Sequence, residues 1–161
     1  DETIVRLAEW PHIVGLKDAT GDTNRPLRLR SLIGSDFRLF SGDDTTAHAF
    51  LLNGGDGCIS VTSNLMPALC CSLFARLRGD KPAIMQPLLA PFAAMTAALF
   101  VETNPVPLKY ALNLLGLMSA KVRLPLTELS REHRSALVEQ VAILMRTQPD
   151  AMIGGLARRS A

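Results

Sequence analysis

The stretch IVGLKDATGD, residues 13–22, decides how this chain is interpreted. Its first four residues are apolar and are typical of a buried strand. A lysine then ends the apolar run, and small, polar residues that favour a turn follow it. Residues 37–41 and 57–61 show the same arrangement, since each is a short run, apolar apart from Arg38, that leads into a polar turn.

Helical patterns separate these short apolar runs. Residues 25–33, 46–52 and 67–78 are predicted helices, and they alternate with strands at 13–17, 37–41 and 57–61. Strands that alternate with helices indicate βαβ units and a parallel sheet. Such strands are buried on both faces. The sequence therefore predicts an α/β fold for residues 1–80.

The second half of the chain has a helical period only. Helices are predicted at 81–101, at about 105–117 and after Ser130, which is placed to cap the last helix. The apolar stripes at 84–99 and 137–145, the latter formed by Leu137, Val141, Leu144 and Met145, are expected to be core or subunit contacts. We therefore predict a separate helical domain at 81–161.

Composition excludes several classes of protein. The 161 residues carry a net charge of +2 with scattered basic residues, which argues against a nucleic-acid partner. The longest nearly apolar run, 88–101, contains Pro91 and is shorter than the roughly 20 residues of a membrane span. No signal peptide is visible at the start of the chain. Cys58, Cys70 and Cys71 are expected to be small core residues in a reducing cytoplasm.

Lys17 is the candidate for chemistry. Ligands bind at the carboxyl ends of parallel strands, so the three polar turns should meet at one site. Partial burial there would favour a neutral amine, which can form a Schiff base with a ketone or aldehyde. The alternative is a strand-end lysine that reaches solvent or pairs with Asp18 or Asp43. The chain has 13 arginines and only 4 lysines, which favours a specific need for an amine.

We predict no metal site. Asp43 and Asp44 could ligate a metal, but a turn that leads into a helix also explains two acidic residues there. The three histidines, which are His12, His48 and His133, lie far apart in the sequence. They show no metal-ligand spacing.

Four motifs carry a resemblance to a known family. They are GLKDATGD at 15–22, LFSGDDTTA at 39–47, GGDGCISVTSNLMP at 54–67 and LFVETNPVPLKYALNLLGLM at 99–118. In order and spacing they resemble the C-terminal portion of the dihydrodipicolinate synthase family, which belongs to the class I pyruvate aldolases and lyases. The resemblance implies about three strands, six to eight, of a (β/α)₈ TIM barrel at residues 1–80. It also implies a C-terminal helical domain at 81–161.

The resemblance also implies a function. It identifies Lys17 as the Schiff-base lysine, Gly42 as pocket wall through its backbone, and Ile59 as the residue whose carbonyl borders bound pyruvate. The expected enzyme is a lyase that condenses pyruvate with aspartate semialdehyde to 4-hydroxy-tetrahydrodipicolinate, in the diaminopimelate pathway of lysine biosynthesis. It is expected to need no cofactor, to be cytoplasmic and to form a homotetramer.

The chain departs from the family pattern in one respect. Its only tyrosine is Tyr110, in the helical half, and nothing matches the family's catalytic tyrosine, relay threonine or substrate arginine. Three strands cannot close a barrel either. Two alternatives therefore stay open: another class I pyruvate aldolase, such as an N-acetylneuraminate-lyase-like enzyme, and an inactive truncated chain.

Overall fold

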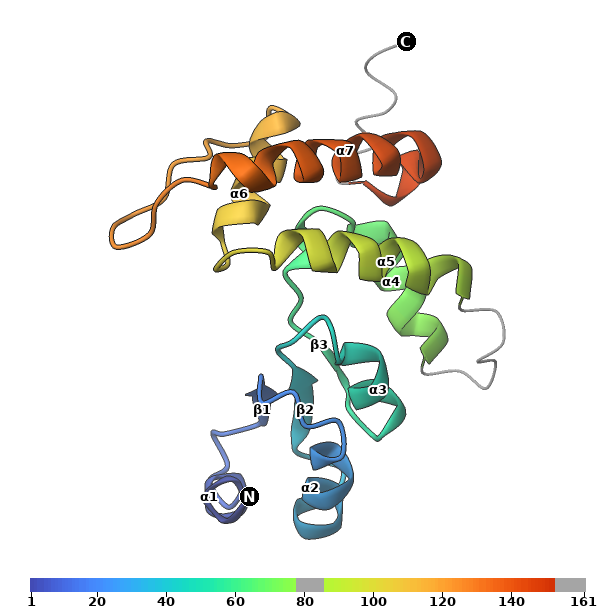
Figure 1. Ribbon diagram of the computed structural model, residues 1–161. Coiled ribbons are helices and arrows are strands. Elements are labelled where there is room, and N and C mark those ends of the chain that lie inside the picture. Colours follow the sequence, from blue (N-terminus) through green and yellow to red (C-terminus); the bar gives the residue numbers. More distant parts are fainter. Residues whose placement is uncertain (78–85, 153–161) are drawn as a thin grey trace. The chain divides into compact units, whose positions relative to one another are not determined.

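The computed structural model describes residues 1–77 and 86–152 (Figure 1). Within these residues the chain is α/β. The strands are β1 (Gly15–Asp18), β2 (Arg38–Ser41) and β3 (Gly57–Cys58). The helices are α1 (Glu2–Ala8), α2 (Arg25–Ile33), α3 (Ala47–Leu52), α4 (Pro67–Leu77), α5 (Gln86–Leu99), α6 (Val106–Leu114) and α7 (Arg131–Thr147), with 3₁₀ turns η1 (Thr62–Asn64) and η3 (Pro149–Ala151).

These residues form two compact units. The first comprises residues 1–60 and 74–77, and the second comprises 61–73 and 86–152. The predicted boundary between a partial barrel and a helical domain, at residues 80 and 81, lies outside the described residues. That boundary stays a prediction.

The sheet of the first unit is parallel, with the strand order β1-β2-β3. Its strands are shorter than predicted, because β1 begins at Gly15 and β3 ends at Cys58. Hydrogen bonding nevertheless continues past the end of β3, where the Ile59 N–H donates to the Ser41 carbonyl at 2.8 Å. The predicted parallel α/β arrangement is therefore confirmed, with four strand boundaries corrected: both ends of β1, the start of β2 and the end of β3.

Only one face of this sheet is buried in the described chain. Leu39 and Ser41 are 0% and 1% exposed, whereas Lys17 and Arg38 on the opposite face are exposed. Neighbouring residues of a strand point to opposite faces, and α3 contacts β2 and β3. The expectation that the strands are buried on both faces is wrong for this chain, because its helices cover one face of the sheet.

Arg30 fixes α2 to the loops around β2 and β3. Its guanidinium donates to the carbonyls of Phe37 and Gly54, and it forms an ion pair with Asp56. Burial alone would raise the pKa of Asp56, but hydrogen bonds from the Leu39 N–H and from Arg30 outweigh it and lower that pKa. The amino end of β2 is therefore held by charge-assisted hydrogen bonds.

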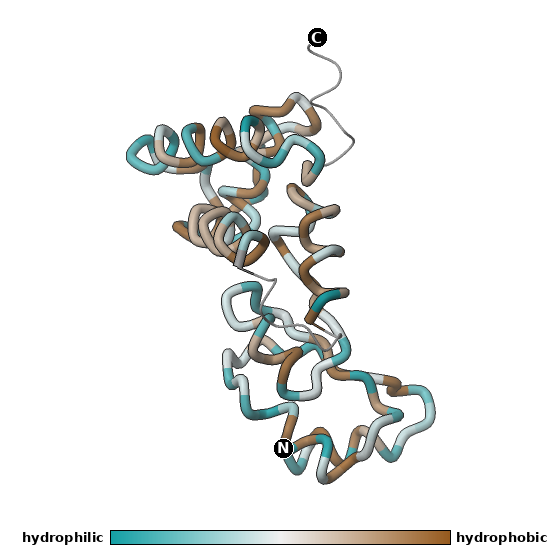
Figure 2. Tube along the Cα trace, turned by 90° about the vertical axis from the view of Figure 1, so that its right-hand side faces the viewer, coloured by the Kyte–Doolittle hydropathy of each residue, from teal (hydrophilic) through white to brown (hydrophobic). Residues whose placement is uncertain are grey.

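The second unit is built from amphipathic helices. The predicted stripe of the last helix is confirmed at Leu137, Val141 and Leu144, which are buried, whereas Met145 is 40% exposed. Figure 2 shows hydrophobic and hydrophilic residues alternating along α7. In α5 the predicted stripe is buried at Phe92, Met95 and Leu99. Positions 84 and 85 of that stripe lie outside the described residues.

The cysteines differ from expectation. Cys70 is buried, but Cys58 is half-buried and Cys71 is exposed. Consecutive helical residues are about 100° apart around the helix axis, so Cys71 cannot share the buried face with Cys70. Among the described helices, none is both long enough and apolar enough to cross a bilayer.

Candidate functional site

The carboxyl ends of the three strands lie in line at one edge of the sheet. The register pairs Asp18 with Ser41 and Ser41 with Cys58. Beyond the strands, the Gly42 N–H donates to the Asp18 carbonyl at 2.6 Å. Parallel pairing therefore brings together the segments that contain Lys17, Gly42 and Ile59, as the sequence predicts.

Lys17 and Gly42 are in direct contact. A methyl carbon placed on Gly42 would lie 2.7 Å from Lys17 Cε and 3.1 Å from Lys17 Cγ. Real carbon atoms do not approach that closely, so the aliphatic part of Lys17 occupies space that any other residue at position 42 would fill. Gly42 therefore shapes the path of the lysine side chain.

Lys17 is an exposed residue, and its amine has no hydrogen-bond or ion-pair partner among residues 1–77 and 86–152. The Asp18 carboxylate pairs with Arg25, and the Asp43 carboxylate accepts from the Thr46 hydroxyl at 2.7 Å. Lys17 therefore pairs with neither Asp18 nor Asp43, and that form of the alternative interpretation is wrong.

The expected shelter around the Lys17 amine is not found among residues 1–77 and 86–152. Strand β1 lies at the edge of the three-stranded sheet, with β2 as its neighbour on one side. No further strand of the described residues covers its other side. The Lys17 side chain points to the face of the sheet that the described helices leave uncovered, so it remains open to solvent.

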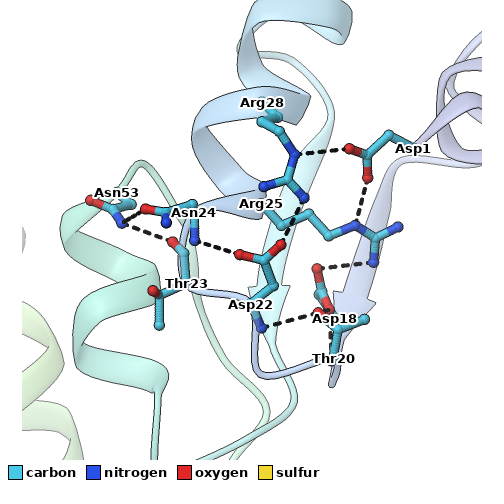
Figure 3. A network of polar contacts seen from close by, with 9 residues as sticks. All are labelled: Asp1, Asp18, Thr20, Asp22, Thr23, Asn24, Arg25, Arg28 and Asn53. Carbon is cyan, nitrogen blue, oxygen red and sulfur yellow. Dashed lines mark hydrogen bonds and ion pairs between the residues drawn. The ribbon is translucent and has the colours of Figure 1, made fainter.

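A polar network holds the turn that follows Lys17 (Figure 3). The buried Asp18 carboxylate accepts hydrogen bonds from Thr20 and from Arg25, and Arg25 also pairs with Asp1 at 2.8 Å. Next to it, Arg28 donates to Asp22 at 2.7 Å.

Two hydrogen bonds act on Asp22 in this network. The one from Arg28 is the main cause of a lowered Asp22 pKa, and the Asn24 N–H adds to it. Sequence reasoning placed a polar turn here but did not predict these pairings.

Ile59 lies just past β3 and is 52% exposed. The predicted strand at 57–61 would include it, but β3 ends at Cys58, so Ile59 is the first residue after the strand. Its N–H completes the pairing with Ser41. The Ile59 backbone is thus fixed at the same edge as Lys17, although its side chain is not packed in a core.

The acidic turn after β2 is accounted for by contacts within the protein. Asp44 is 1% exposed, and its carboxylate lies 3.7 Å from the Cys58 sulfur. The Asp43 carboxylate accepts the Thr45 N–H at the start of α3. In the part of the chain that the structure describes, no group of three or more His, Cys, Asp or Glu side chains could hold a metal ion.

A second polar cluster was not predicted from the sequence. It lies in the second compact unit, residues 61–73 and 86–152, which we call the helical unit. His133 Nδ1 lies 2.8 Å from Glu102 Oε1 and 3.0 Å from Ser130 Oγ. Both partners contact the same ring nitrogen, whereas a nucleophilic triad needs the hydroxyl and the acid on different nitrogens. Hydrogen bonds from Ser130 and His133 lower the pKa of Glu102 to about 2. The cluster therefore ties the start of α7 to the loop after α5.

Tyr110, the only tyrosine in the chain, lies in the helical unit. The Arg134 guanidinium lies 5.5 Å from the centre of its ring. This is the geometry of a cation–π contact.

Comparison with known proteins extends over most of the chain. A sequence model of the dihydrodipicolinate synthetase family matches residues 1–144. The 4-hydroxy-tetrahydrodipicolinate synthase of Rhodospirillum centenum is 51% identical over 144 residues, which cover 85% of this chain and 48% of the relative. The synthase of Shewanella frigidimarina is 44% identical over 86% of this chain and 47% of its own length.

Comparison with solved structures leads to the same family as the sequence comparisons. The chloride-inhibited dihydrodipicolinate synthase of Acinetobacter baumannii, solved in complex with pyruvate, superposes with a TM-score of 0.82 and is 40% identical. The match covers 88% of this chain and 48% of that structure. The synthase of Aquifex aeolicus gives a TM-score of 0.84 at 29% identity, over 95% of this chain and 51% of that one.

The chain spans about half the length of the curated relatives it matches. Its three parallel strands and the helices around them correspond to part of the fold of the solved synthases. The family match, the sequence relatives and the solved structures all point to one assignment, and the chain belongs to the dihydrodipicolinate synthetase family.

Proposed function

We propose that the complete polypeptide that contains this chain is a 4-hydroxy-tetrahydrodipicolinate synthase. It condenses pyruvate with aspartate semialdehyde and uses Lys17 as the Schiff-base nucleophile. The observation that carries the proposal is the identity of 51% to a relative of that name, together with a family match over residues 1–144, which include Lys17 and the turn against which it packs.

The chemistry needs an amine at a fixed place. Lys17 Nζ attacks the ketone carbon of pyruvate, and loss of water leaves a protonated imine. The imine nitrogen withdraws electrons, so a methyl proton leaves and an enamine forms. The enamine carbon then bonds to the aldehyde carbon of the semialdehyde. The amino group of the new adduct finally attacks the imine carbon, which closes the ring and releases Lys17.

Lys17 must also be able to lose its proton. Burial disfavours the charged form of an amine, whereas solvent exposure does not. We propose that the complete polypeptide contains a part equivalent to the unmatched half of the relatives, and that this part covers the Lys17 amine. We also propose that this part supplies the acid–base group, because nothing in the present sequence matches the catalytic tyrosine of the family.

Gly42 and Ile59 complete the proposed pocket. The backbone of Gly42 forms its wall beside Lys17, and the Ile59 carbonyl borders the bound keto acid. Both belong to the edge of the sheet where Lys17 lies. The pyruvate bound to the Acinetobacter baumannii relative supports a keto acid as the first substrate. We further propose a homo-oligomer.

A steady-state assay tests the proposed reaction. The complete polypeptide is supplied with pyruvate and aspartate semialdehyde, and formation of the cyclic product is followed. Lys17→Arg keeps the charge but cannot form the imine, so it should reduce the rate to the background. Lys121→Arg, at an exposed lysine of the helical unit, is the matched control and should retain the wild-type rate. A wild-type rate in Lys17→Arg would contradict the proposal.

Substrate range separates the synthase from the first of the two alternatives, another class I pyruvate aldolase. An enzyme of the N-acetylneuraminate-lyase type would cleave that sugar acid and would not use aspartate semialdehyde. The sequence relatives favour the synthase, since the two relatives compared above carry that name. The isolated 161-residue chain is expected to form no product, because the cover and the acid–base group are not part of it.

A further inference from the structure

The position of Lys17 depends on the residue that follows it. Asp18 is the last residue of β1, and its side chain lies on the face of the sheet opposite that of Lys17. It is 5% exposed, so its carboxylate is removed from water. A buried carboxylate must be compensated by hydrogen bonds or by charge.

Thr20 and Arg25 provide that compensation. Asp18 Oδ1 accepts two hydrogen bonds from Thr20, one from its N–H at 2.9 Å and one from its hydroxyl at 2.7 Å. Asp18 Oδ2 accepts from Arg25 Nη1 at 3.2 Å. The turn after β1 is therefore folded around the Asp18 carboxylate (Figure 3).

The backbone of Asp18 holds the opposing turn. Its carbonyl accepts the Gly42 N–H at 2.6 Å, and Gly42 is the residue against which the Lys17 side chain packs. One residue thus ties together the end of the strand that carries Lys17, the turn after that strand and the turn after β2. A shift of Asp18 would move Lys17 and Gly42 relative to each other.

We propose that the Thr20 hydroxyl and the Arg25 guanidinium are positioning groups, which hold Lys17 in place through Asp18 for its attack on a 2-keto acid. This inference rests on the proposed function. Neither group needs to contact the substrate. Misplacement of a reacting group by about 1 Å can cost about a hundredfold in rate. Loss of one short, charge-assisted hydrogen bond is expected to cost about tenfold.

The test measures imine formation in the complete polypeptide. Pyruvate and borohydride are added, and the rate of irreversible labelling is followed as a function of pyruvate concentration. Thr20→Val removes the hydroxyl with little change in shape, and it also removes the acceptor of a weak bond from the Asp22 N–H at 3.3 Å. Thr20→Ser keeps the hydroxyl and is the matched control.

The expected result is specific to positioning. Thr20→Val should lower the maximal labelling rate about tenfold and leave the half-saturating pyruvate concentration within about twofold of wild type. Thr20→Ser should restore the maximal rate. A purely structural role would reduce the amount of folded protein, measured by circular dichroism, without changing the rate per folded site.

A second variant guards against a folding defect. Arg25→Met retains the Asp18 and Thr20 side chains but removes the ion pairs of Arg25 with Asp18 and with Asp1, and it should also lower the maximal rate. Wild-type rates in both Thr20→Val and Arg25→Met, or equal losses in Thr20→Val and Thr20→Ser, would overturn the inference. Absence of labelling at Lys17 in the wild type would instead overturn the proposed function, so the two failures are distinguishable.

Discussion

Replacement of Gly42 by alanine tests how closely the turn after β2 controls Lys17. The new methyl carbon would lie 2.7 Å from Lys17 Cε, whereas ordinary van der Waals contact begins at 3.4 Å. Lys17 must therefore move by about 0.7 Å or more at that carbon. The added methyl would also lie 3.2 Å from the Ala19 side chain, so the turn after β1 limits how the strain can be relieved.

The expected result is a loss of rate without a loss of fold. Because a displacement of about 1 Å can cost about a hundredfold, we expect kcat for the condensation to fall between about tenfold and about a hundredfold. The nearest atoms belong to a flexible side chain, so the melting temperature should change by no more than about 4 °C. Steady-state kinetics and thermal unfolding of the complete polypeptide measure both quantities. An alanine variant with wild-type kcat would refute the contact between Lys17 and Gly42.

Two further predictions concern stability. Gly15→Ala would place a methyl carbon 2.6 Å from the Arg38 carbonyl oxygen, an atom that cannot move without shifting β2. Denaturant titration should therefore show that the free energy of unfolding falls by about 1–3 kcal/mol. An unchanged unfolding midpoint would contradict the β1–β2 register. Glu102, whose pKa falls from 4.5 to about 2 on folding, contributes stability above about pH 4.5 that is lost as the pH falls toward about 2. The stability advantage of wild type over Glu102→Gln should therefore shrink across that range, and a constant difference at all pH values would rule out the contacts of Glu102 with Ser130 and His133.

The boundaries of α2 could be predicted because its signals are local. The predicted range, 25–33, is the range found. Pro26 lies in its first turn, and Gly34 follows its last residue with φ of 75°, a conformation that favours glycine. The burial of its apolar residues could not be predicted in the same way. Leu27 and Leu32 are 53% and 58% exposed, because burial depends on which surfaces the rest of the protein provides.

The site was predictable in its placement but not in its surroundings. Alternating strands and helices place Lys17 at the carboxyl edge of a parallel sheet, and pairing brings Gly42 beside it. The exposure of Lys17 depends on what covers its face of the sheet, which the local sequence does not encode. Long-range polar pairs are equally hidden from sequence reasoning. An example is the buried contact between the hydroxyls of Thr62 and Thr96, 2.9 Å apart and 34 positions apart in the chain.

The most direct measurement is the site of covalent labelling by pyruvate. The complete polypeptide is treated with pyruvate and borohydride, which reduces the imine to a stable secondary amine, and the modified peptide is identified by mass spectrometry. The account predicts a single modified lysine, Lys17, and no modification when pyruvate is omitted. Modification at Lys109 or Lys121 instead, or no pyruvate-dependent modification at all, would contradict it.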